Sequence, residues 1–168
     1  ALLGTAILTV TTDLQRPPAV TEPRNPLFEQ SVRESFGSQA LMTTLGARLI
    51  RVAPGEVDIE VPFRADLTQQ HGFLHAGVVS SAMDSACGYA ALSMMPEGVG
   101  VLTVEFKTNL TAPARGERLI ARGRVIRAGR TITVCQADAV MISDEGETLV
   151  ATMLATIMTV RDRPGVVG

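Results

Sequence analysis

Residues 76–92 read AGVVSSAMDSACGYAAL, a run of small and apolar residues that contains a single charged side chain, Asp84. In the thirty residues from Leu67 to Pro96, Asp84 is the only Asp, Glu, Lys or Arg. A solvent-facing helix of this length normally carries several charges along its polar face. The stretch therefore predicts a helix of about four to five turns that other elements enclose.

Segments on both sides of this stretch have the pattern of β-strands. In the clearest one, apolar residues at 57, 59, 61 and 63 alternate with polar ones or proline, which predicts a strand with one solvent-facing side. Turn-like residues at 127–130 and 144–146 join consecutive runs, so these strands should pair antiparallel. The six runs are Leu45–Ala53, Glu56–Phe63, Val99–Leu110, Glu117–Arg127, Thr131–Ser143 and Thr148–Val160.

The order of elements predicts the fold class. A segment with helical spacing, Leu27–Phe36, precedes two strands, the long helix and four more strands. This order indicates an α+β domain in which a strongly bent antiparallel sheet surrounds one central helix. We expect a leader and proline-rich linker over 1–26, a helical segment over 27–43, the domain itself over 44–163 and a tail over 164–168. The short apolar run Leu2–Val10 has no basic residues before it and is not read as a signal peptide.

Composition limits the classes of function. The chain has 168 residues, 15 basic and 17 acidic side chains and a formal net charge of −2. This balance gives no electrostatic footprint for nucleic-acid binding, and no apolar run approaches the ~20 residues that span a bilayer. Cys87 and Cys135 lie among apolar residues, which indicates buried thiols in a reducing cytoplasm. With five Phe, one Tyr and no Trp, the core must consist of aliphatic and small side chains.

Asp84 is the first candidate for a functional residue. A buried carboxylate must be paired or neutralised, so Asp84 is either a functional group or an Asp that is hydrogen-bonded to backbone or hydroxyl groups at a subunit contact. At 3.6 residues per turn, Asp84 shares a small, polar helix face with four other residues, as a groove that admits a narrow substrate would require. These are Gly77, Ser81, Gly88 and Ala91.

The start of the same helix is the second candidate. The loop reads QQHGFLHAG over 69–77, and small residues where a helix begins leave backbone N–H groups at the positive end of its dipole. Such groups can hold a developing oxyanion. His71 and His75 have no third ligand at metal spacing and no Cys nearby, so we expect no metal. The sequence has no nucleophile elbow, P-loop or GxGxxG motif.

Together these features resemble the hotdog-fold acyl-CoA thioesterases of the PaaI-like, phenylacetate-degradation branch. The matching residues are His75-Ala76-Gly77, Asp84, the segment TVEFKTNL at 103–110 followed by Ala112-Pro113-Ala114, and the Arg-Ala-Gly-Arg turn at 127–130. The resemblance covers about residues 44–161. It implies a six-stranded sheet wrapped around the long helix, and subunits that pair edge to edge as a homodimer, often paired again as a tetramer. It places the active sites at the dimer interface.

The resemblance also implies roles for individual residues. Asp84 would act as general base or as nucleophile, and a backbone N–H of Gly77 or Ala76 would polarise the thioester carbonyl. Gln69 stands where related members have an Asn that helps to hold the carbonyl or the water, and Thr103 stands where a hydroxyl positions the water. His75, Ala76 and Ser81 would line the substrate site. Such an enzyme needs no metal and no cofactor beyond the CoA of its substrate.

Nearly all basic residues are arginine, and this is relevant to the binding of CoA. Lys107 is the only lysine, and six arginines fall between 115 and 130, with Arg122 and Arg124 on one strand face. Arg suits phosphate through its bidentate fork. The resemblance places Gly129 and Arg130 near the mouth of the CoA site, although an ordinary solvated strand face would give the same composition.

Two alternatives remain open from the sequence. A hotdog dehydratase or hydratase would need a catalytic His near the acyl β-carbon, for which His71 or His75 is available. A non-catalytic module that binds acyl-CoA would keep the fold and the pocket without hydrolysis.

Overall fold

The protein is described by a computed structural model that covers residues 22–161 and 165. Of the leader predicted over 1–26, residues 1–21 lie outside the described residues, as do 162–163 of the predicted domain and 164 and 166–168 of the predicted tail. The elements are α1 (Phe28–Ser38), α2 (Ala40–Leu45), β1 (Arg48–Ala53), β2 (Glu56–Pro62), the 3-10 turn η1 (Ala65–Leu67), α3 (Ala76–Leu92), β3 (Gly100–Leu110), β4 (Arg118–Ala128), β5 (Ile132–Ser143) and β6 (Gly146–Val160).

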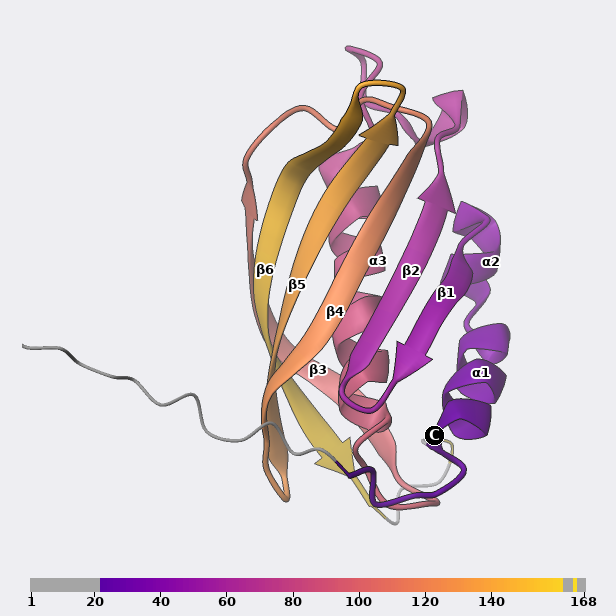
Figure 1. Cartoon of the computed structure of the whole chain (residues 1–168), viewed down its shortest axis with the longest axis vertical. Helices are drawn as coiled ribbons and strands as arrows, with labels where there is room; N and C mark the ends of the chain where they lie inside the picture. The colour runs from indigo at the N-terminus through magenta and orange to yellow at the C-terminus, as the bar shows by residue number, and fades with distance from the viewer. Residues whose placement is uncertain (1–21, 162–164, 166–168) are drawn as a thin grey trace, which may run out of the picture.

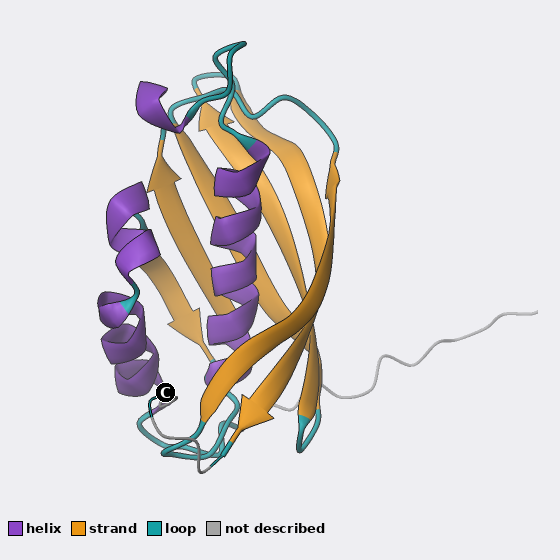
Figure 2. Ribbon diagram, turned by 180° about the vertical axis from the view of Figure 1, so that it is seen from behind, coloured by secondary structure: helices purple, strands orange, loops and turns teal. Residues whose placement is uncertain are grey.

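The six strands form one antiparallel sheet in the order β1-β2-β4-β5-β6-β3. The predicted pairing of β4 with β5 and of β5 with β6 is confirmed. The sheet curves around α3, and α1 and α2 pack beside that helix along β1 (Figures 1 and 2). The predicted α+β class, with a curved sheet around one long helix, is therefore confirmed. β1 and β3 are the two edges of the sheet.

The central helix has the predicted bounds and environment. α3 has seventeen residues, of which ten are buried. Its close packing on the sheet depends on Gly123 of β4, because a Cβ at that position would lie 2.4 Å from the carbonyl carbon and oxygen of Ala86. A glycine in β4 thus lets the strand backbone approach the helix backbone.

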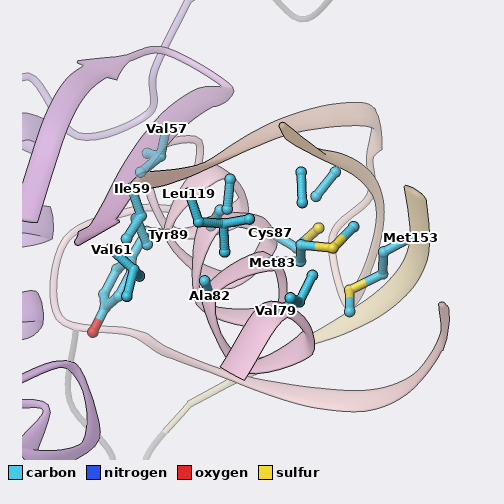
Figure 3. Packing of buried hydrophobic residues seen from close by; sticks show 14 of the residues in the cluster. Val57, Ile59, Val61, Val79, Ala82, Met83, Cys87, Tyr89, Leu119 and Met153 are labelled. Carbon is cyan, nitrogen blue, oxygen red and sulfur yellow. The ribbon is translucent and has the colours of Figure 1, made fainter. Parts of the chain in front are cut away.

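The core is aliphatic and rich in methionine, as the scarcity of aromatic residues predicts. Figure 3 shows Met83, Cys87 and Met153 on one side of the cluster and Val57, Ile59 and Val61 on the other. Cys87 and Cys135 are both buried and unbridged. Burial raises the pKa of both thiols, that of Cys135 to about 12.

The N-terminal part of the domain differs from the prediction. The helical segment consists of two helices, and the second continues to Leu45. It ends at Gly46, whose φ of 66° is the left-handed conformation typical of a residue that terminates a helix. The first strand therefore begins at Arg48 and not at Leu45, which is instead a buried apolar residue of α2.

The polar side of β2 is less exposed to solvent than the alternation of apolar and polar residues in its sequence predicts. Glu60 is buried, and its carboxylate forms ion pairs with Arg48 of β1 and Arg118 of β4. The strand is internal to the sheet, so its neighbours on both sides cover this polar side chain and neutralise its charge.

Candidate functional site

Asp84 lies in the middle of α3 and meets a hydroxyl from the edge strand β3. The Thr103 hydroxyl donates a hydrogen bond of 2.7 Å to Oδ1 of Asp84. Partial burial raises the pKa of the Asp84 carboxyl above its usual value of 3.8, and the hydrogen bond from Thr103 opposes part of that rise. The structure thus brings together two residues that the family resemblance assigned to one site.

A cavity of about 320 Å³ opens beside this pair. Its walls come from α3, from β3 and from the N-terminal helices. Asp84 is the only charged residue among them. The lining residues are Ser35, Gln39, Asp84, Ser85, Gly88, Tyr89, Leu92, Val101, Leu102 and Thr103.

The start of α3 is capped by a histidine side chain. Nδ1 of His75 accepts a hydrogen bond of 2.9 Å from the Gly77 N–H. A Cβ at position 77 would lie 3.0 Å from the same nitrogen, so glycine is what allows the imidazole to approach. In a neutral ring with this bond, the proton is on Nε2.

The cap decides which backbone N–H is available at this helix start. The Gly77 N–H is bound to His75, and the N–H groups of Val78 and Val79 bond to the His75 carbonyl. Within the described part of the chain, no hydrogen bond is recorded for the Ala76 N–H. Of the two donors that the sequence left open, Ala76 is therefore the one without a partner.

Gln69 and Ala76 line a second cavity, of about 420 Å³. The Gln69 side-chain oxygen accepts a hydrogen bond from the His71 N–H, so this half of the amide holds the loop together. The other half, its NH₂ group, remains as a donor. The remaining lining residues are Phe73, Leu74, Val79, Leu110, Thr111, Ala112, Pro113, Ala114 and Val150.

The two halves of the predicted site are separate within one chain. The first cavity holds Asp84 and Thr103, the second holds Gln69 and Ala76, and the two have no lining residue in common. Eight residues along α3 correspond to a rise of about 12 Å between Ala76 and Asp84. Both cavities border β3 or the loop that follows it, at the unpaired edge of the sheet.

Other predicted residues lie away from these groups or are already engaged. The Ser81 hydroxyl donates to the Gly77 carbonyl at 2.7 Å, within the helix itself. Arg122 forms two hydrogen bonds with Glu147, and Arg124 pairs with Asp138, so their guanidinium groups are bound to carboxylates on the sheet surface.

Arg130 and Gly129 lie in the β4–β5 hairpin, at the end of the molecule opposite the start of α3 (Figure 1). Arg130 is exposed. Gly129 is required sterically, since a Cβ there would lie 2.2 Å from the Ile132 carbonyl oxygen. Within one chain, this turn is therefore remote from the loop at 69–77.

The structure adds residues to the first cavity that sequence reasoning missed. The Ser85 hydroxyl and the Tyr89 hydroxyl donate to Oε1 of Gln39, at 3.2 and 3.4 Å. Ser85 and Tyr89 are one helical turn apart, a spacing that could have been read from the sequence. Gln39 is 46 residues from Ser85 and had no sequence signal that linked the two.

The described residues contain neither a metal-binding cluster nor a membrane-spanning helix. Among residues 22–161 and 165, no group of three or more His, Cys, Asp or Glu side chains is arranged to hold a metal ion. In the same residues, no helix combines the length and apolar character needed to cross a bilayer.

Comparisons with known proteins identify the family of the chain. The family model described as the thioesterase superfamily matches residues 71–150, which include α3 and the edge strand. A "putative esterase" of Halobacterium salinarum is 30% identical over 121 residues, 69% of this chain and 80% of that protein. The solved structure of a thioesterase family protein from Silicibacter pomeroyi is 53% identical, with a TM-score of 0.78, and the match covers 79% of this chain and 98% of that one.

A further solved structure bears on the fold. The PaaI protein of the Escherichia coli phenylacetic acid degradation operon matches with a TM-score of 0.71 over 80% of this chain and 94% of that one, at 18% identity. The fold and the family together define a hotdog-fold hydrolase of the thioester-cleaving class. The chain belongs to the thioesterase superfamily, as the resemblance in its sequence predicts.

Proposed function

We propose that the protein hydrolyses acyl-CoA thioesters to a free acid and CoA, with Asp84 as the general base. The observation that carries the proposal is the half-buried Asp84 carboxylate, hydrogen-bonded to Thr103 at the wall of a cavity. A carboxyl group whose pKa is raised by burial is a stronger base than a solvated one. The family supports thioester hydrolysis as the reaction class.

In this route Asp84 removes a proton from water while the water oxygen bonds to the thioester carbonyl carbon. The carbonyl becomes an oxyanion, which collapses as the carbon–sulfur bond breaks. The departing CoA sulfur takes the proton from Asp84, so the carboxylate is regenerated and no cofactor is consumed. If Asp84 instead attacks the carbonyl itself, an anhydride forms and water hydrolyses it in a second step.

The oxyanion needs a hydrogen-bond donor, and we assign this role to the Ala76 N–H. It lies in the first turn of α3, where the helix dipole favours negative charge, and it is not bound by the His75 cap. The NH₂ group of Gln69, in the same cavity, is available as a second donor.

We further propose that a second copy of the chain completes each site. The donors and the base line separate cavities, and β3 presents an unpaired edge with exposed apolar residues, among them Val104 and Phe106. Two β3 strands that pair antiparallel would bring the start of one α3 toward the middle of the other. A homodimer built in this way satisfies the edge strand and joins the two halves.

The CoA nucleotide would contact the β4–β5 hairpin, where Arg130 is exposed beside Gly129. Antiparallel pairing of two subunits would place the hairpin of one chain at the same end as the α3 start of its partner. The buried, unbridged thiols support a reducing, cytoplasmic location.

The test is release of free thiol from a panel of acyl-CoAs by the wild type and by Asp84→Asn. We expect kcat to fall at least ~10²-fold in the variant, with an unchanged circular dichroism spectrum. A fully active Asp84→Asn variant would contradict the assignment of the base. Tight CoA binding without hydrolysis of any thioester would favour the acyl-CoA-binding module instead.

A further inference from the structure

We infer that the cavity beside Asp84 is the acyl pocket, that Gly88 sets its width, and that Gln39 selects acyl groups with a hydrogen-bonding substituent. This inference rests on the proposed function and names the substrate class on which it would act. It concerns Gln39, between α1 and α2, and residues of α3 that have no part in the chemistry of thioester cleavage described above.

The cavity is suited to the acyl group and not to the coenzyme. CoA is a polyanion, and sites for phosphate groups in proteins are lined by Arg, Lys or backbone N–H groups at a helix start. The lining of this cavity has no Arg or Lys, and its one charged side chain is the carboxylate of Asp84. The cavity volume of about 320 Å³ corresponds to roughly ten water molecules, which indicates a compact acyl group and not a long fatty chain.

Gly88 faces open space in this cavity. It lies one helical turn beyond Asp84, and a Cβ built on it would meet no atom within 4 Å apart from its chain neighbours and the nearby backbone of its own helix. A glycine inside a helix costs about 0.5–1 kcal/mol relative to alanine, so its presence calls for a reason other than helix stability. Gly123 of β4 is a glycine because the helix backbone lies against it, but no neighbouring element lies against Gly88 in this way. The space beside Gly88 is therefore open to a ligand.

The wall opposite β3 is polar. Gln39 lies between α1 and α2, and its side-chain oxygen accepts hydrogen bonds from both Ser85 and Tyr89 of α3. The three side chains fix one another, because both hydroxyls are directed to one oxygen. The Gln39 NH₂ group is then left as a donor whose position is set by the protein. Figure 3 shows the Tyr89 hydroxyl at the margin of the hydrophobic cluster, away from Met83 and Cys87.

A donor held in this way discriminates between substrates. An acyl group with a hydroxyl or carbonyl oxygen at its distal end could accept a hydrogen bond from Gln39, whereas a plain hydrocarbon would leave the amide without a partner. We therefore expect the enzyme to prefer compact acyl groups with a distal oxygen over unsubstituted acyl groups of equal length.

The first experiment compares Gly88→Leu with the wild type on acetyl-CoA, hexanoyl-CoA and benzoyl-CoA. We expect kcat/KM for the two larger substrates to fall at least ~10-fold while that for acetyl-CoA stays within about twofold, since only the larger groups reach position 88. Gly37→Leu is the matched control, because Gly37 is also helical and open but lies on the exposed surface of α1. Equal loss on all three substrates, or no loss on any, would overturn the assignment of Gly88.

The second experiment tests Gln39 with a matched substrate pair, hexanoyl-CoA and 6-hydroxyhexanoyl-CoA. In Gln39→Leu we expect the preference for the hydroxylated substrate to fall at least ~10-fold, mainly through its KM. Gln30→Leu, on the exposed face of α1, is the control. If the ratio of kcat/KM for the two substrates is unchanged in Gln39→Leu, the proposed selectivity role of Gln39 is wrong. A wild type that hydrolyses no thioester would contradict the proposed function itself, which is a different outcome from an altered or unaltered preference.

Discussion

At the scale of single residues, the behaviour of Asp84 follows from partial burial and one hydrogen bond. Burial raises the pKa of its carboxyl, and catalysis needs the ionised form. The pH profile of kcat/KM should therefore have an acidic limb, on which kcat/KM falls as the pH decreases, with its midpoint above the usual carboxyl pKa of 3.8. The Thr103 hydroxyl stabilises the ionised form, so Thr103→Val should raise the pKa further and move this limb to higher pH, while Thr103→Ser should restore it. A pH profile of kcat/KM measures both shifts, and an unmoved limb in Thr103→Val would show that the Thr103 hydroxyl does not stabilise the ionised Asp84 carboxylate.

The same shift predicts the stability of Asp84→Asn. A carboxyl whose pKa is raised on folding opposes folding: the opposition grows as the pH rises from the usual value of 3.8 through the raised pKa, is complete above that pKa, and is absent below 3.8. Near neutral pH the Asn variant should therefore have a Tm equal to or above that of the wild type, measured by thermal unfolding. At pH 3, where both proteins carry no charge at this position, the difference should vanish. A variant that unfolds well below the wild type at pH 7 would show that the carboxylate has a structural role.

The Ala76 N–H can be removed without removing the helix. Proline is favoured at the first position of a helix, and His75 before it already has extended backbone angles, φ −62° and ψ 141°. We expect Ala76→Pro to lower kcat by about 10²–10³-fold, the loss typical of one oxyanion donor, with little change in Tm. Steady-state kinetics and thermal unfolding measure the two quantities. An active Ala76→Pro variant would assign the oxyanion to another donor.

At the scale of elements, the backbones of β4 and α3 are in close contact at Gly123. A methyl group at Gly123 would overlap the Ala86 backbone, which cannot move aside as a flexible side chain could. We expect Gly123→Ala to lower the free energy of unfolding by about 1–3 kcal/mol or more, as overpacking does. Gly37→Ala, at an exposed helical position, should instead raise it by about 0.5–1 kcal/mol. Urea unfolding of both variants checks the contrast, and a neutral Gly123→Ala would mean that the sheet can move away from the helix.

At the scale of the whole molecule, a shared active site predicts complementation between inactive subunits. Asp84→Asn lacks the base and Ala76→Pro lacks the donor, so a mixed dimer has one site with both groups intact. After unfolding and refolding of an equal mixture, we expect about a quarter of the wild-type activity, because half of the dimers are mixed and each has one intact site of two. Activity no higher than that of the separate variants would place both groups in the same chain.

Local sequence determined the central helix, the strand pairs joined by short turns, and the candidate role of Asp84. These features depend on periodicity, turn chemistry and a missing charge, all of which are read within about thirty residues. Local sequence also indicated the helix start as a donor site, whereas the family resemblance added Thr103 and Gln69, and the roles of all three stay predictions. Tertiary structure alone decided that β3 pairs with β6 at the edge of the sheet, that His75 binds the Gly77 N–H and leaves Ala76 free, and that Gln39 meets Ser85 and Tyr89. The physical reason is that each of these depends on side-chain geometry or on contacts across many residues, which no local pattern specifies.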